Sequence, residues 1–403
     1  MSDETEGKKT PPKKSASKPA ASASGGASAP PPAGPPEKQG YWERAMWEPI
    51  QDWFPYGAVA AIVAGFVVIM ALGPLNIINS TNIYQAGYRG TGMATIYETG
   101  AYQAAMATID QIPESDPPYE VDPNEPLAAD IYENVQVLGH LSEDNFLRLM
   151  TAITEWVSPD QGCEYCHTAE GFANDDLYTK VVSRRMIQMT QAVNSEWQSH
   201  VGYTGVNCWT CHRGNNVPEY IWFNKEPEHR RLLGGWANNQ NRSNMRAAST
   251  SLPSNTFERF LVGDDEIRVT PEAALSDSTG LDTMDTEWTY SLMIHMSTSL
   301  NVNCAYCHNT RAFHDWDQSP PARTTAWYGI RMVRDLNNAY LDPLQPVYPD
   351  YRLGPTGDAP KLNCTTCHQG VYKPLFGEPM IVDWPELAAP GPRAANSQAA
   401  LTD

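Results

Sequence analysis

The sequence has no cysteine outside one repeated motif. All 8 of its cysteines belong to four repeats of one five-residue word, Cys-x-x-Cys-His, so none remains for a disulfide or a lipid anchor. Basic residues are also scarce, because 28 lysines and arginines face 47 aspartates and glutamates, a formal net charge of -19. A surface of this charge repels nucleic acid and attracts cationic partners, which excludes the nucleic-acid-binding classes.

The four words are the strongest chemical signal in the chain. In a Cys-x-x-Cys-His word, two thiols add to the two vinyl groups of one porphyrin, and the following histidine supplies an iron ligand. The sequence therefore predicts four covalently bound haem c groups and their iron. The attaching cysteines are Cys163, Cys166, Cys208, Cys211, Cys304, Cys307, Cys364 and Cys367, and the proximal ligands are His167, His212, His308 and His368.

Two other chemistries use cysteine pairs, and both explain these words less well. Zinc words pair up closely in sequence, whereas these words lie 45, 96 and 60 residues apart. A disulfide framework needs no histidine after every pair. Because haem c is attached outside the cytoplasm, the words also place residues 163–368 in the periplasm or its equivalent.

Composition divides the chain into three regions. Residues 1–40, rich in Pro, Ala, Ser, Gly and Lys, cannot bury enough apolar surface to fold, and we expect a disordered cytoplasmic tail. Residues 41–80 begin with an aromatic segment typical of a membrane interface, followed by an apolar run of about 20 residues that predicts one transmembrane helix. Residues 81–403 are then the periplasmic haem domain.

We expect this domain to be mainly α with long loops and few strands, because porphyrins supply much of its apolar core. Each word is preceded by a helical segment that carries a methionine. Leu149-Met150 and Leu292-Met293 precede the first and third words, and Arg185-Met186 and Arg331-Met332 precede the second and fourth. The pattern predicts two pseudo-symmetric halves with two haems each.

The methionines are candidate sixth ligands of the irons. Thioether sulfur raises the potential of a haem, and a second imidazole lowers it. The repeat favours Met150, Met186 and Met293, and by itself it proposes Met332 for the fourth haem. The competitors on the same segments are Met189 and Met296, and His200 ends the helical run that contains Met186.

Four stretches resemble the tetrahaem cytochrome c subunit of the purple-bacterial photosynthetic reaction centre. The second stretch contains YTKVVSRRMIQMTQ and the fourth contains WYGIRMVRDLN. Together with the four words, the stretches cover most of residues 88–390. The resemblance implies Met150, Met186 and Met293 as sixth ligands of the first three haems, and His200, in place of Met332, as that of the fourth. Many members are lipoproteins with an N-terminal cysteine, which this chain lacks. The stretches are Val135–Cys166, Tyr178–Gly214, Val302–Phe313 and Ala326–Phe376.

The function that the resemblance implies is electron transfer in photosynthesis. A soluble cationic periplasmic donor, such as a small cytochrome c or a high-potential iron-sulfur protein, would reduce the haems, which reduce the photo-oxidised bacteriochlorophyll pair. The implied partners are the L and M type membrane subunits and a light-harvesting antenna. The resemblance implies the bacterial inner membrane as the location, and the apolar run together with the periplasmic words predicts a single-pass topology with a cytoplasmic N-terminus. There are two alternatives. A membrane quinol dehydrogenase would favour imidazole ligation of its irons, and a multihaem reductase would need one iron with an open sixth position.

Overall fold

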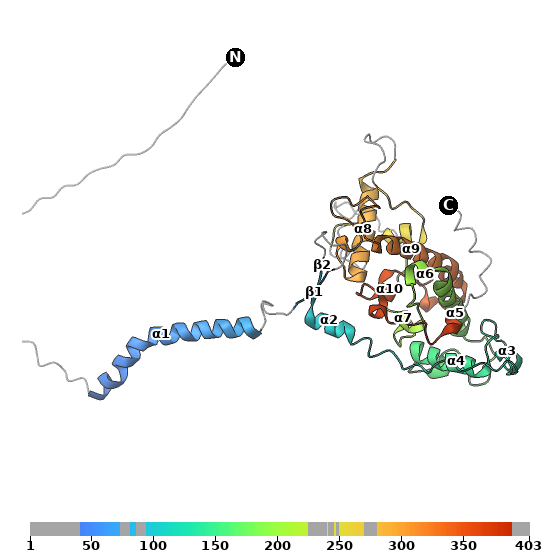
Figure 1. The fold of residues 1–403 in the computed structure, drawn as a ribbon, viewed down its shortest axis with the longest axis horizontal. Helices are drawn as coiled ribbons and strands as arrows, with labels where there is room; N and C mark the ends of the chain where they lie inside the picture. Colours follow the sequence, from blue (N-terminus) through green and yellow to red (C-terminus); the bar gives the residue numbers. More distant parts are fainter. Residues whose placement is uncertain are drawn as a thin grey trace, which may run out of the picture. The chain divides into compact units, whose positions relative to one another are not determined.

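The computed structural model describes residues 41–72, 81–85, 94–224, 240, 246, 250–269 and 280–388. The chain divides into two units, Met1–Ile78 and Asn79–Asp403. The predicted tail, residues 1–40, lies outside the described residues. Helices dominate the regular structure of the second unit (Figure 1), which confirms the predicted mainly α class.

The first unit contains one long helix, α1 (Tyr41–Leu72). It continues through Pro49, so the aromatic segment and the apolar run form one helix rather than two. Its apolar side chains are open to solvent, with Phe54 at 71%, Ile62 at 70% and Phe66 at 60% exposure. Among the described residues, no helix combines the length and hydropathy that crossing a membrane requires.

The second unit begins with a β-hairpin. Strand β1 (Thr81–Gln85) pairs antiparallel with β2 (Ala94–Glu98), and Ile83 lies opposite Ile96. Helix α2 (Thr99–Met106) follows β2 directly. In the part of the chain that the structure describes, these are the only two strands, in line with the few strands expected.

The first two words lie among the next helices. Helix α4 begins with two acidic residues in its first turn, which favours a helix N-terminus because of the helix dipole. The elements of this half are α3 (Ala128–Ile131), α4 (Glu143–Val157), the 3-10 turn η1 (Gly162–Tyr165), α5 (Tyr178–Glu196), α6 (Gln198–Val201) and α7 (Cys208–His212).

The third and fourth words lie among the remaining elements. Helix α8 is capped at its N-terminus by Asp282, whose carboxylate accepts hydrogen bonds from the backbone N–H groups of Met284 and Asp285. At its C-terminus it is followed by Asn301 in the left-handed region. The elements are η3 (Glu258–Val262), α8 (Thr283–Leu300), η5 (Cys304–Tyr306), α9 (Ala322–Asp335), η6 (Leu336–Leu341), η7 (Asp342–Val347), η8 (Asp350–Arg352), α10 (Cys364–His368), η9 (Pro374–Gly377) and η10 (Pro385–Leu387).

Two hydrophobic cores support these halves. One gathers around Phe257, directly before η3, together with Leu292 on α8 and Ile330 on α9. The other gathers around Leu149 on α4 and the C-terminal segment. Helix α5 joins both, since Val193 lies in the first core and Ile187 in the second.

The C-terminal segment returns to the first half. Arg148 on α4 forms a buried ion pair of 2.5 Å with Glu386. On α5, Gln191 donates to the backbone oxygen of Glu386 at 3.0 Å, and Asn194 donates to that of Leu387 at 2.9 Å. This segment therefore fastens α4 and α5 to each other.

Candidate functional site

The second and fourth words fold as short helices, α7 and α10. Each is capped by an asparagine directly before the first cysteine, Asn207 or Asn363, whose side-chain oxygen accepts a backbone N–H of the first turn. A threonine in the word returns the bond, because Thr210 accepts from the N–H of Asn207 and Thr366 from that of Asn363, both at 3.1 Å. These reciprocal caps fix the direction in which each word starts.

The first and third words fold differently. They adopt the 3-10 turns η1 and η5, and their first cysteines, Cys163 and Cys304, are exposed. By contrast, Trp209 and Thr210 in the second word and Thr366 in the fourth are buried. The second and fourth words thus lie deeper in the fold than the first and third.

The histidines that end the four words are all oriented in the same way. Each places Nδ1 within hydrogen-bond distance of a backbone oxygen, which can only accept, so Nδ1 carries the proton and Nε2 is left to bind a metal. The distances are 3.0 Å from His167 to Phe172, 2.8 Å from His212 to Asn215, 2.8 Å from His308 to Phe313 and 3.0 Å from His368 to Val371.

The protonation of these rings suits ligation as well. Burial lowers the pKa of His167, His212 and His308 below the ordinary histidine value. For His368, burial first and the neighbouring His200 second lower the pKa to about 4. The rings are therefore neutral at physiological pH, which is the form that binds a metal.

His200 lies opposite His368. The two ring centroids are 6.1 Å apart, with an angle of 68° between the ring planes. His200 also points Nδ1 at a backbone oxygen, that of Thr325, at 2.9 Å. An imidazole nitrogen binds a metal at about 2 Å, so the gap fits one iron ligated from both sides. The donor set therefore fits a haem iron held by two histidines.

A large cavity joins the cysteines and histidines of three words. Its volume is about 1380 Å³, beyond the roughly 300–1,000 Å³ of a pocket for one small ligand. Cys304, Cys307, His308 and Met293 of the third site are not among its lining residues. Among the described residues, no group of three or more His, Cys, Asp or Glu is placed to hold a metal ion by itself. The predicted site residues that line the cavity are Met150, Cys163, Cys166, His167, Met186, His200, Cys208, Cys211, His212, Cys364, Cys367 and His368.

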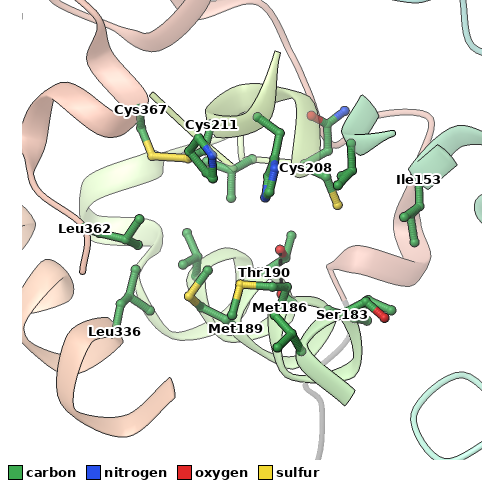
Figure 2. A pocket seen from close by; sticks show the side chains of 18 of the residues that line it. Ile153, Ser183, Met186, Met189, Thr190, Cys208, Cys211, Leu336, Leu362 and Cys367 are labelled. Atoms are coloured by element: carbon green, nitrogen blue, oxygen red, sulfur yellow. Dashed lines mark hydrogen bonds between the residues drawn. A yellow bond between two sulfur atoms is a disulfide. The ribbon is translucent and has the colours of Figure 1, made fainter. Parts of the chain in front are cut away.

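The methionines on α5 point into this cavity together. Figure 2 shows the sulfur atoms of Met186 and Met189 side by side, facing Cys208 and Cys211 across the cavity. Met332 lines the cavity as well, and it is buried at 9% exposure within the first core. The structure thus brings Met150, Met186 and Met332 to the cavity, and it does not separate Met186 from Met189.

Helix α8 also carries two candidate methionines, which are those named for the third site. Met293 and Met296 are both partly buried against the first core. Met296 lines the cavity, whereas Met293, the predicted ligand, does not. The assignment of Met293 therefore stays a prediction.

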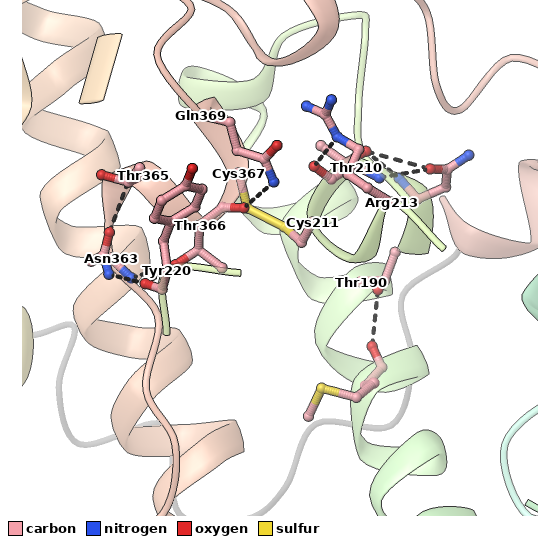
Figure 3. The surroundings of a disulfide bond; sticks show 12 residues. Thr190, Thr210, Cys211, Arg213, Tyr220, Asn363, Thr365, Thr366, Cys367 and Gln369 are labelled. Atoms are coloured by element: carbon pink, nitrogen blue, oxygen red, sulfur yellow. Dashed lines mark hydrogen bonds between the residues drawn. A yellow bond between two sulfur atoms is a disulfide. The ribbon is translucent and has the colours of Figure 1, made fainter. Parts of the chain in front are cut away.

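Cys211 and Cys367 form a disulfide, with their Cα atoms 4.6 Å apart (Figure 3). This differs from the expectation that every cysteine attaches haem. A sulfur bonded to its own Cβ and to a vinyl carbon has no further bond to give, so the disulfide and the two attachments exclude each other. The disulfide requires the second and fourth words to lie side by side, and helices α7 and α10 do contact each other.

Matching backbone hydrogen bonds recur in the two halves. Gly214, three residues after Cys211, donates to the oxygen of Trp156 on α4 at 2.9 Å. Gly370, three residues after Cys367, donates to the oxygen of Ser299 on α8 at 2.8 Å. Each bond ties the end of a word to the helix that carries a predicted methionine ligand.

Two buried asparagines brace the words from the other side, and the sequence reasoning missed them. Asn194 accepts from the N–H of Val206 and donates to its oxygen, both at 2.8 Å. Asn337 does the same with Leu362, at 2.7 and 3.0 Å. Val206 and Leu362 each lie two residues before the first cysteine of a word. Asn194 lies 14 residues before Cys208 and Asn337 lies 27 residues before Cys364, so no fixed spacing in the sequence could have found them.

Comparison with known proteins gives consistent matches. Residues 78–388 match the family model described as photosynthetic reaction centre cytochrome C subunit. The photosynthetic reaction center cytochrome c subunit of Rubrivivax gelatinosus is 50% identical over 317 residues, covering 78% of this chain and 85% of the relative. The subunit of Thermochromatium tepidum is 48% identical over 75% of this chain and 74% of its own length. That of Roseobacter denitrificans is 46% identical over 82% and 91%.

Proposed function

Because the chain belongs to the family of photosynthetic reaction centre cytochrome c subunits, we propose that it carries electrons from a soluble periplasmic donor to the photo-oxidised bacteriochlorophyll pair. The protein transfers electrons in photosynthesis as a part of the reaction centre, and it is not an enzyme. The quinol dehydrogenase and reductase hypotheses are set aside by this assignment.

The four words hold four haem c groups in this proposal. When bound, haem c supplies a one-electron iron couple. The chain's eight cysteines fix the position of each group, and His167, His212, His308 and His368 hold the irons from one side. The geometry that carries the proposal is the pair His200 and His368, with centroids 6.1 Å apart and both Nδ1 atoms tied to backbone oxygens.

The other faces of the irons are assigned to Met150, Met186, Met293 and His200. Met150 and Met186 line the cavity beside the first and second words. Three thioether sites and one site with two histidines predict three higher potentials and one lower one, since sulfur raises the potential and a second imidazole lowers it.

We also propose the spatial order of the words and the pseudo-symmetry of the two halves. Helix α4 contacts α7, α7 contacts α10, and α10 contacts α8. Since α4 and α8 carry the methionines assigned to the first and third words, this order runs first, second, fourth, third. The recurring bonds of Gly214 and Gly370 to α4 and α8 support the two-half arrangement.

We assign α1 as the membrane anchor, with the N-terminus cytoplasmic and the haem domain periplasmic. Its exposed apolar side chains, including Ile62 and Phe66, support this assignment because a helix open to water on such a face needs an apolar environment. The helix would contact the L and M type subunits or the antenna. The domains are then the tail (1–40), the anchor segment (41–80) and the haem domain (81–403).

The soluble donor is assigned as a cationic protein, a small cytochrome c or a high-potential iron-sulfur protein. The chain's net charge of -19 supports this, because opposite charge speeds the encounter of two proteins. The rate of reduction should accordingly fall as salt is added.

A single short flash on membranes that contain the protein tests the function. Haem oxidation should follow the flash and match the re-reduction of the pigment pair in time. Haems that stay reduced after the flash, in membranes where the pigment pair is oxidised, would contradict the proposal.

A further inference from the structure

The His200 ring lies directly on the backbone of α9. Its Nδ1 donates to the oxygen of Thr325, on the first turns of that helix, at 2.9 Å. The ring is buried deeply enough to lower its pKa, through loss of hydration. An imidazole can approach a helix this closely only where the helix has no side chain in the way.

That place is Gly329. A Cβ built on Gly329 would lie 2.5 Å from Cε1 of His200, 2.7 Å from Nδ1 and 3.2 Å from Nε2. Carbon atoms in good contact are about 3.5–4.0 Å apart, so no side chain fits beside the ring in this position. A glycine inside a helix also destabilises it relative to alanine, so its presence here calls for a reason other than helix formation.

The two buried asparagines, Asn194 on α5 and Asn337 on η6 directly after α9, give the register between α5 and the helical run α9–η6. Asn194 and Asn337 make the same pair of bonds to the residue two before a word, so they are equivalent. Met186 lies eight residues before Asn194, and Gly329 lies eight residues before Asn337. Gly329 therefore occupies in the second half the place that Met186 has in the first.

Burial along the two helices agrees with this register. In the same alignment the buried residue Ile187 corresponds to Ile330, and Val193 corresponds to Leu336, which are buried as well. Met332 then corresponds to Met189 and not to Met186. This corrects the repeat seen in the sequence, where Arg185-Met186 was matched with Arg331-Met332.

We propose that Gly329 is the positioning residue that selects the sixth ligand of the fourth haem. The repeat position of a methionine ligand is left without a side chain, and the His200 ring from the other half fills the space and faces His368. The inference rests on the proposed function, in which His200 ligates that iron. It adds that the choice of imidazole over thioether is made by a glycine on α9.

Gly329→Ala in the full-length protein tests this. The added Cβ should push the His200 ring away, so the electron paramagnetic resonance signal of a haem with two histidines should be lost. The potential of the fourth haem should rise in a redox titration, because an imidazole is lost. Gly100→Ala is the matched control: Gly100 is also helical, and a Cβ there meets nothing within 4 Å. An unchanged signal and potential in Gly329→Ala would overturn the proposal.

Two further variants keep the test decisive if Gly329→Ala accumulates poorly. Combining it with His200→Ala removes the clash, so the double variant should accumulate as His200→Ala alone does. A double variant that still fails to accumulate would show that the glycine is needed for another reason and would overturn the proposal. Gly329→Met combined with His200→Ala should add one haem with thioether ligation, seen as a gain in the near-infrared sulfur-to-iron band. The absence of that gain would overturn the register.

His200→Ala alone distinguishes an error in the ligand set of the proposed function from an error in the role of Gly329. If it leaves the signal of the haem with two histidines unchanged, the ligand set in the proposed function is wrong. If it abolishes the signal while Gly329→Ala leaves it intact, the ligand set stands and only the role of Gly329 fails.

Discussion

Replacing Asn337 by alanine should loosen the fourth word. The Asn337 side chain is fully buried. It accepts the N–H of Leu362 at 2.7 Å and donates to the oxygens of Leu362 at 3.0 Å and Leu261 at 2.8 Å. Because Leu362 lies two residues before Cys364, the asparagine fixes where the word begins.

The expected loss in the free energy of unfolding follows from the hydrogen-bond partners that the variant removes. The buried N–H of Leu362 loses the asparagine oxygen, which costs about 1–3 kcal/mol, and the lost bond to Leu261 adds about 0.5–1.5 kcal/mol. The oxygen of Leu362 keeps the bond from Trp222 Nε1 at 2.8 Å, so its loss adds little. We expect the free energy of unfolding to fall by about 2–4 kcal/mol, roughly 30- to 700-fold in the equilibrium constant.

Two variants provide the comparison. Asn338→Ala removes a single bond to the oxygen of Val262 from an exposed side chain, and it should cost well under half as much. Asn194→Ala removes the equivalent brace of the second word and should cost about as much as Asn337→Ala, since it also makes three such bonds.

Urea unfolding of the purified protein in detergent, followed by circular dichroism of the haem band, measures these differences. Asn337→Ala should also speed amide exchange at Leu362 while Asn194→Ala leaves that amide protected. A loss no larger than that of Asn338→Ala would refute the view that this asparagine braces the word.

Three further outcomes are expected. Met186→Leu should remove one haem's near-infrared thioether band while Met189→Leu keeps it; the reverse result would assign Met189. Arg148→Ala should lower the free energy of unfolding by about 3–5 kcal/mol, because it leaves the carboxylate of Glu386 buried and unpaired; urea unfolding checks this, and a loss below that of an exposed arginine contradicts it. An arginine hydrogen bond lowers the pKa of Asp175 to about 2, so its stabilising effect is full above the unfolded value of about 3.9 and is lost as pH falls towards 2. Thermal unfolding of Asp175→Asn should therefore depend less on pH in that window than the native chain, and parallel curves would contradict this.

Local patterns in the sequence predicted the chemistry best. A Cys-x-x-Cys-His word contains its own attachment points and proximal ligand within five residues, so no tertiary information is needed to name them. The helix over the apolar run and the mainly α class likewise followed from composition, whereas the continuation of α1 through Pro49 did not. The hairpin of β1 and β2 is too short and too local to stand out from the surrounding loops.

Contacts between the halves could not be predicted in this way. His200 reaches the fourth word from the first half, and only the family resemblance assigned it. The repeat misaligned Met332 because 27 residues separate Asn337 from Cys364, whereas 14 separate Asn194 from Cys208. An insertion of this kind hides the register until hydrogen bonds reveal the equivalent residues. The space above Gly329 depends on a ring from another helix, so no local pattern encodes it.

The central claim is that all four words attach haem, and the bonding of Cys211 and Cys367 tests it most directly. Neither cysteine can attach haem while the two are joined to each other. Accurate mass measurement of the purified full-length protein, followed by peptide mapping without reduction, settles it. The proposal predicts the mass of the chain plus four haems, with a haem on the peptides of all four words. A mass with fewer haems, together with a peptide pair joined through Cys211 and Cys367, would contradict it.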